Sequence, residues 1–161
     1  MIWPFLALKS DDNPNPSGDF FMVFEISEEP SGLRILFSSV MSNIDMADTA
    51  VRKFLAVRGL DSHSFSVCLV MREALTNAVR HGNRMDIEKM VICRIYIEDD
   101  SIVLDISDEG EGFSWKDLIS ADSLDHLMES GRGLAIIKFY FSSWTFNEKG
   151  NHLILRKKID S

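Results

Sequence analysis

Cysteine and positive charge are both scarce in this chain of 161 residues, which has two cysteines and 17 basic against 25 acidic residues. Cys68 and Cys93 lie far apart in apolar segments and form no CxxC or Cys/His ligand pattern. We therefore expect small core residues in a reducing compartment. The net charge of −8 argues against a general nucleic-acid or anionic-membrane binder, because such partners attract basic surfaces. A small anionic ligand stays possible, since its site needs only local donors.

Long apolar runs are missing as well. The opening MIWPFLALKS lacks a basic start and is too short for a signal peptide or a membrane span, so we expect a cytoplasmic protein with no membrane partner. Internal repeats and low-complexity tracts are also absent. We expect residues 1–19, with the Pro/Asn/Asp-rich SDDNPNPSG, to be a flexible extension. Residues 20–161 then form a single domain, long enough to bury a core.

What the sequence does contain is an alternation of short strands and amphipathic helices. Strands are predicted at residues 20–26, 33–40, 90–97 and 101–107, with a final hairpin around Gly150. Helices are predicted at about 45–58, with Gly59 as a left-handed C-cap, from a cap at Asp61 or Ser62 to Gly82, and after Gly131. This order predicts an α+β two-layer sandwich, with helices on one face of a mostly antiparallel sheet.

The stretch MREALTNAVRHGNRMD (71–86) carries the first candidate site. Glu73, Asn77 and His81 recur every four residues, so they stack beside an apolar helix face. A carboxylate one turn from a carboxamide matches the oxygen ligands that Mg²⁺ takes when phosphates and waters supply the rest. The alternative is a solvated face, with His81 complementing the helix end and Gly82 as its C-cap.

The second candidate is Asp108, in SIVLDISDEGEGF (101–113). Strict alternation places it on the apolar face of its strand. A carboxylate there costs free energy unless it accepts a hydrogen bond, which the amino group of adenine could donate. Gly110 and Gly112 would let the backbone approach a flat ligand closely. The alternative is a turn in which Asp108 bonds its own backbone.

The third candidate is SGRGLAII, in which Gly131 and Gly133 open a predicted helix beside Arg132. First-turn amides of a helix bind anions, and glycine allows close approach to phosphate oxygens. The alternative is a flexible loop before an ordinary helix start. The sequence has neither a GxxxxGK[ST] P-loop nor a Rossmann fingerprint. Together the three motifs supply an oxygen pair for Mg²⁺, a carboxylate for adenine and a glycine loop for phosphates, which are the needs of Mg-ATP.

These motifs resemble those of a known superfamily. EALTNAVRHGN, DEGEGF and SGRGLAII are similar to the N, G1 and G2 boxes of the ATPases that include gyrase, heat-shock chaperones, histidine kinases and mismatch-repair proteins. Within it, the chain is most similar, over roughly residues 33–159, to bacterial anti-sigma factor serine/threonine kinases of the partner-switching type. The resemblance implies the Bergerat ATP-binding fold, with a mixed, mainly antiparallel sheet and a mobile lid at residues 114–130.

The resemblance also assigns roles to the motif residues. It implies Glu73 as general base, Asn77 as Mg²⁺ ligand and Asp108 as the acceptor for the adenine amine. Gly110 and Gly112 would line the base pocket, while Gly131, Arg132 and Gly133 would hold the phosphates of ATP.

The function implied is a kinase that phosphorylates an antagonist protein and sequesters a sigma factor, commonly as a homodimer. Alternatives are a non-catalytic nucleotide-dependent switch and a detached histidine-kinase ATPase domain.

Several positions depart from the family pattern. Asn151 and His152 follow Gly150, where family members often have a threonine, and Glu129 stands where some kinases have a basic residue. The lid sequence is acidic. The first helix, part of the partner surface in the family, carries Asp48 with Arg52 one turn later.

Overall fold

A computed structural model of the chain describes residues 22–115 and 132–159. Six strands lie in these ranges: β1 (Phe24–Glu29), β2 (Gly32–Ser38), β3 (Met90–Glu98), β4 (Ser101–Asp108), β5 (Ser143–Phe146) and β6 (His152–Lys158). They form one sheet in the order β1-β2-β3-β4-β6-β5, and the described pairings are antiparallel. The helical elements are α1 (Met41–Ala56), η1 (Asp61–His63), α2 (Ser64–Asn77), η2 (Ala78–Gly82) and α4 (Arg132–Tyr140).

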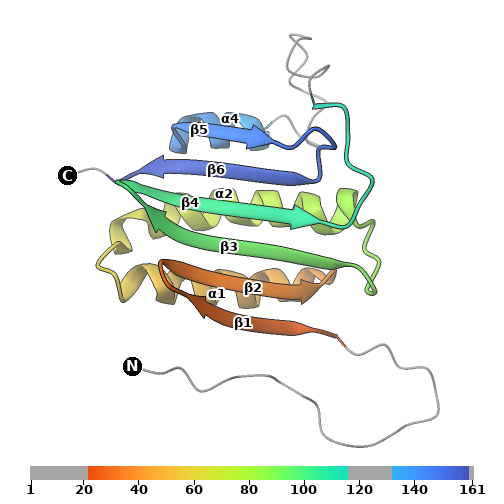
Figure 1. The fold of residues 1–161 in the computed structure, drawn as a ribbon, viewed down its shortest axis with the longest axis horizontal. Coiled ribbons are helices and arrows are strands. Elements are labelled where there is room, and N and C mark those ends of the chain that lie inside the picture. Colours follow the sequence, from red (N-terminus) through yellow and green to blue (C-terminus); the bar gives the residue numbers. More distant parts are fainter. Residues whose placement is uncertain (1–21, 116–131, 160–161) are drawn as a thin grey trace, which may run out of the picture.

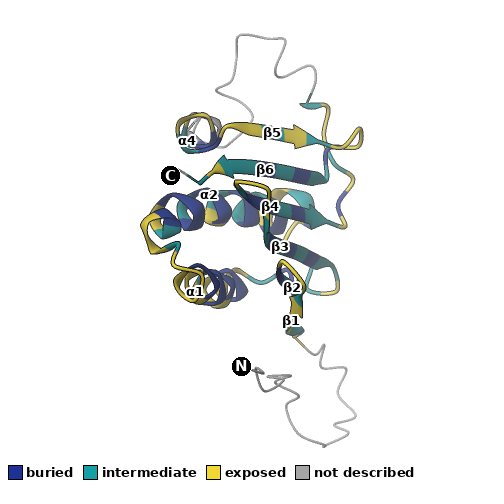
Figure 2. Ribbon diagram, turned by 60° about the vertical axis from the view of Figure 1, so that its left-hand side comes forward, coloured by how far each residue is buried: buried dark blue, intermediate teal, exposed yellow. Residues whose placement is uncertain are grey.

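The helices cover one face of this sheet (Figures 1 and 2), which confirms the predicted two-layer sandwich. α2 lies between α1 and α4 and packs against both. Its apolar positions share one core with alternate strand residues such as Ile95 and Leu104, both fully buried, because successive strand residues point to opposite faces. In the described part of the chain, no helix combines the length and the apolar character needed to cross a bilayer.

The turns follow the sequence prediction more closely than the helix starts do. Gly59 has a φ of 69° after α1, as expected for a left-handed cap. α1, however, begins at Met41, one turn earlier than predicted, where the Asn43 carboxamide donates to Ser38 O at 2.9 Å. The predicted cap of α2 is wrong: Asp61 and Ser62 lie in the 3₁₀ turn η1, and no side chain caps α2.

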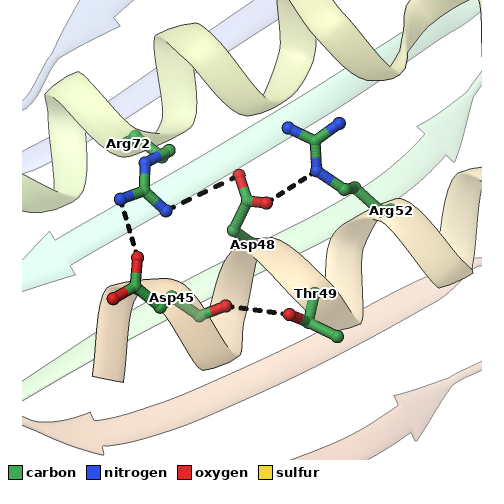
Figure 3. A network of polar contacts seen from close by, with 5 residues as sticks. All are labelled: Asp45, Asp48, Thr49, Arg52 and Arg72. Atoms are coloured by element: carbon green, nitrogen blue, oxygen red, sulfur yellow. Dashed lines mark hydrogen bonds and ion pairs between the residues drawn. The ribbon is translucent and has the colours of Figure 1, made fainter. Parts of the chain in front are cut away.

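An ion-pair cluster joins α1 to α2 (Figure 3). Arg72 on α2 lies 2.7 Å from Asp45 and 3.9 Å from Asp48, which are both on α1. Arg52 lies 2.6 Å from Asp48, one helical turn away. The Asp48 side chain is 14% exposed, so the acidic departure in the first helix is part of a helix–helix contact.

Both cysteines are free and buried, as predicted for core residues. The pKa of Cys68 is raised to about 11. Burial is the main cause, and the nearby Asp48 carboxylate contributes to the same shift. Burial likewise raises the pKa of Cys93 to about 12. Both thiols therefore stay protonated near neutral pH and behave as small apolar side chains.

Candidate functional site

The end of α2, the end of β4 and the turn between β5 and β6 lie at the same end of the sheet (Figure 1). Asp108 is the last residue of β4. Asn151, next to the turn, holds the backbone of Asp108 in two ways. Its carbonyl accepts the Asp108 N–H at 3.0 Å, and its Nδ2 donates to Asp108 O at 3.0 Å. Asn151, which follows Gly150 where the expected pattern often has a threonine, therefore contacts the candidate site.

The Asp108 carboxylate lies between two glycines. A Cβ atom added to Gly82 would stand 2.5 Å from the Asp108 Cγ, and one added to Gly110 would stand 2.7 Å from its Oδ1. Gly82 does not have the positive φ of a left-handed cap, so the C-cap alternative for this glycine is wrong. Gly82 is required here because a side chain would displace the carboxylate.

The helix that carries Gly82 changes geometry before it ends. α2 stops at Asn77, and residues 78–82 form a π turn that the Asn83 N–H closes on Ala78 O at 2.8 Å. A π turn has more residues per turn than an α-helix, and such turns are frequent at functional sites. His81 lies within this π turn and is exposed, whereas Glu73 and Asn77 lie on the regular part of α2 and are half-buried.

Asp108 is half-buried, and that burial raises the pKa of its carboxyl group. The Gly110 N–H, which donates to Oδ1 at 2.8 Å, and Lys149 and Lys89 act in the opposite direction. The alternative prediction, a turn in which Asp108 bonds its own backbone, is therefore also correct. The Gly110 N–H uses Oδ1, while no described residue donates a hydrogen bond to Oδ2.

Gly112 and Gly150 interlock the loop after β4 with the β5–β6 hairpin. Their φ values are 75° and 83°, and the Phe113 N–H donates to Lys149 O at 3.0 Å. A Cβ on Gly112 would stand 2.6 Å from the Lys149 carbonyl carbon and closer still to its oxygen. The ring of Phe113 also packs edge-on against Phe146, with centroids 5.2 Å apart. Gly112 is therefore needed for loop packing, whatever ligand the loop contacts.

Glu73 and Asn77 are half-buried and stand one turn apart on α2. Arg72 and Cys68 mark the flank of α2 that faces α1, through the contacts with Asp48. Successive helix residues are rotated by about 100°, which places Glu73 and Asn77 on the opposite flank. That is the side on which α4 lies (Figure 2).

A cavity of about 100 Å³ adjoins these elements. It is lined by His81, Gly82, Arg84, Lys89, Glu111 and Gly112. Arg84 and Lys89 are basic, and Glu111, which lies 3.9 Å from Arg84, is acidic, so the lining has an excess of one basic side chain over acidic ones. Small-molecule sites typically measure roughly 300–1,000 Å³, so this cavity can hold only part of a nucleotide.

The third motif is described in part. α4 begins at Arg132 and contains the buried Gly133, as the predicted helix requires. Gly131, the side chain of Arg132 and most of the predicted lid lie outside the described residues, as does the predicted extension at residues 1–19.

The described residues are compatible with Mg²⁺ only as a sparsely coordinated ion. They contain no group of three His, Cys, Asp or Glu side chains that could hold a metal ion. Magnesium bound through one or two protein oxygens plus phosphates does not need such a group. Asn77, with Glu73 one turn away, fits that mode.

Sequence reasoning missed two further residues of this region. The sequence indicates Gly82 only as a possible cap and Asn83 only as the last residue of the EALTNAVRHGN motif. The motif marks both positions but not their roles, because these depend on Asp108 and Glu109, which are more than 20 residues away along the chain.

A two-layer sandwich that carries these three motifs, in a sequence without a P-loop, is the arrangement expected of one class of ATP-binding domain. Residues 37–157 match the family described as Histidine kinase-like ATPase domain. The chain belongs to this family, and membership in an ATPase domain family implies that it binds ATP.

The chain is similar to curated proteins over most of its length. An "Anti-sigma F factor" of Clostridium perfringens is 27% identical over 138 residues, covering 80% of this chain and 97% of the relative. An "Anti-sigma F factor" of Oceanobacillus iheyensis is 29% identical over 136 residues, covering 79% and 92%. The family match at residues 37–157 spans all three motifs.

Proposed function

We propose that this chain is an ATP-dependent serine/threonine protein kinase that phosphorylates an antagonist protein and also sequesters a sigma factor. The observation that carries the proposal is the shared location of the motif residues. Glu73 and Asn77 lie on the helix whose final π turn holds Gly82 against Asp108. This arrangement supports the proposal that the candidate base, metal ligand and adenine acceptor act on one nucleotide.

Each residue has a defined part in the proposed transfer. As the target hydroxyl oxygen bonds to the γ-phosphorus and ADP leaves, Glu73 accepts the hydroxyl proton. Asp108 orients the nucleotide by accepting from the adenine amine. Asn77 would hold Mg²⁺, which when bound neutralises charge on the phosphates. Amides at the start of α4, with Gly131, Arg132 and Gly133, would hold the phosphate oxygens.

The two partners are proposed from the relatives. Both proteins named above are anti-sigma F factors, which supports a sigma factor as the sequestered partner. The antagonist would compete for the chain and be released when phosphorylated. The first helix is part of the partner surface in the family, and here Asp48 on that helix is paired with Arg52 and Arg72. Because this differs from the family pattern, the proposal does not extend to which sigma factor is bound.

The direct test captures the partners of the full chain with and without ATP, and then incubates each with labelled ATP and the purified chain. We expect label on a serine or threonine of one partner and no label on the other. A partner that binds in a nucleotide-dependent way but never becomes labelled would instead support a non-catalytic switch. The acidic lid sequence, with Asp117, Asp122, Asp125 and Glu129, favours this second candidate.

Asp108→Asn should weaken ATP binding, because a carboxamide is a weaker acceptor and can point its donor at the adenine amine. The expected loss is about 1–3 kcal/mol, or a roughly 5- to 150-fold higher Kd by titration calorimetry. Asp105→Asn on the same strand, whose carboxylate contacts His152 on the open face, is the matched control. Equal ATP affinities of wild type and Asp108→Asn would contradict the adenine role.

The same variant has a signature in stability. Folding raises the pKa of Asp108, so the folded state binds this proton more tightly than the unfolded chain does. The contribution of Asp108 to stability therefore falls as pH rises through the window between its ordinary and its raised pKa. Asp108→Asn, which has no such proton, should lack this component.

Gly82→Ala should lower ATP affinity without a backbone penalty. The new Cβ would overlap the Asp108 carboxylate and force it to move, so the loss should approach that of Asp108→Asn. Gly59→Ala is the control: its φ of 69° is strained for alanine, but its Cβ would meet nothing within 4 Å. We expect Gly59→Ala to reduce stability and leave the ATP Kd unchanged, as measured by calorimetry and thermal unfolding.

A further inference from the structure

Buried polar side chains gather beside Asp108. Among the described residues, the buried polar side chains are Ser38, Ser39, Asn43, His63, Ser66 and Asn83. Four of these lie at the end of the sheet where β4 ends, while His63 and Ser66 lie at the beginning of α2. Burying polar groups costs free energy unless they are hydrogen-bonded, so the network that satisfies the four defines a fixed structure.

Asn83 is the centre of this network. Its side chain is fully buried, and its Nδ2 donates to Ser39 Oγ at 2.7 Å and to Met90 O at 2.9 Å. Its Oδ1 accepts the Glu109 N–H at 2.8 Å. Both donor positions of the carboxamide are therefore used, and so is its acceptor.

These bonds join segments that are distant in the sequence. Ser39 lies between β2 and α1 and donates to Lys89 O at 2.8 Å. Met90 begins β3, and Glu109 follows Asp108 directly. Asn83 itself follows Gly82, the residue packed on the Asp108 carboxylate. One side chain thus fixes the peptide after Asp108 relative to the glycine that faces its carboxylate.

The loop after Asn83 is strained. Arg84 and Met85 have φ values of 55° and 58°, a left-handed conformation that costs roughly 1–2 kcal/mol for a residue with a Cβ atom. Such strain persists only where surrounding structure imposes it. The bond from Asn83 to Met90 O spans this loop, so Asn83 holds the strained segment in place.

We propose that Asn83 is a positioning residue of the nucleotide site. It holds Asp108 and Gly82 at the separation that presents the carboxylate to the adenine amine. Because Asn83 is fully buried, it acts through Asp108 and not by touching the nucleotide. This inference rests on the proposed adenine role of Asp108.

The test compares two network variants, Asn83→Ala and Ser39→Ala, with Ser66→Ala. Ser66 is the matched control, since its hydroxyl is also buried and donates to a backbone carbonyl, His63 O, at 3.0 Å. We expect both network variants to raise the Kd for ATP by roughly 2- to 30-fold. Ser66→Ala should lose stability while keeping the wild-type Kd. If Asn83→Ala does not fold, the Kd for ATP of Ser39→Ala still tests the inference.

Two measurements on the nucleotide-free protein separate positioning from general destabilisation. The Glu109 amide should lose hydrogen-exchange protection in Asn83→Ala, and the pKa of Asp108, followed by NMR, should fall toward its ordinary value in both network variants. Neither should change in Ser66→Ala. An unchanged ATP Kd in Ser39→Ala and in folded Asn83→Ala, or a Kd change shared with Ser66→Ala, would overturn the inference. Absence of ATP binding in the wild-type chain would overturn the proposed function, and the inference with it.

Discussion

Glu73→Ala is expected to keep ATP binding and to lose transfer of the γ-phosphoryl group to the antagonist. In the proposed mechanism, Glu73 accepts the proton of the target hydroxyl, and a positioned base contributes roughly 10²–10⁴-fold to rate. The adenine contact assigned to Asp108 is made from the end of β4, beside Gly82 at the far end of the helical segment, and is not altered. The measurement is single-turnover transfer from labelled ATP, together with the Kd for ATP.

Glu28→Ala is the control for the change of charge. Glu28 is an exposed residue of the edge strand β1, and we expect wild-type transfer from this variant. Undiminished transfer by Glu73→Ala would remove Glu73 as the base. Loss of ATP binding together with transfer would show instead that Glu73 is needed to build the site.

Gly112→Ala is expected to cause the largest loss of stability among single changes at the site. Alanine at a φ of 75° costs roughly 1–2 kcal/mol, and the overlap with the Lys149 carbonyl adds roughly 1–3 kcal/mol of overpacking. The loop can avoid the overlap only by giving up the bond from Phe113 N–H to Lys149 O. Chemical denaturation measures the free energy of unfolding.

Gly59→Ala provides the reference for this prediction as well. It shares the positive φ but has open space around the new methyl group, so its loss of stability should include the conformational part alone. The difference between the two variants then reports the packing of the loop on the β5–β6 hairpin. Equal losses in both variants would show that this packing does not contribute.

Much of the fold was predictable because its signals are local. Alternation along residues 90–107 predicted the hairpin of β3 and β4, and the structure has it with Asp99 at a φ of 51° in the turn. The helix starts were less predictable. α1 begins a turn earlier than predicted, where Asn43 bonds the end of β2, and a contact that depends on another element leaves no local pattern.

The sequence by itself determined the sandwich and its three motifs in order, and through them the membership in an ATPase family. Residue type and spacing sufficed, because hydrophobic periodicity and glycine positions act over a few residues. Only the tertiary structure decided why Gly82 is a glycine, how Asn151 contacts the Asp108 loop and what Asn83 holds. Those roles arise where segments separated by tens of residues come within hydrogen-bonding or van der Waals distance. Such contacts depend on how the chain folds, and no short stretch of sequence encodes them.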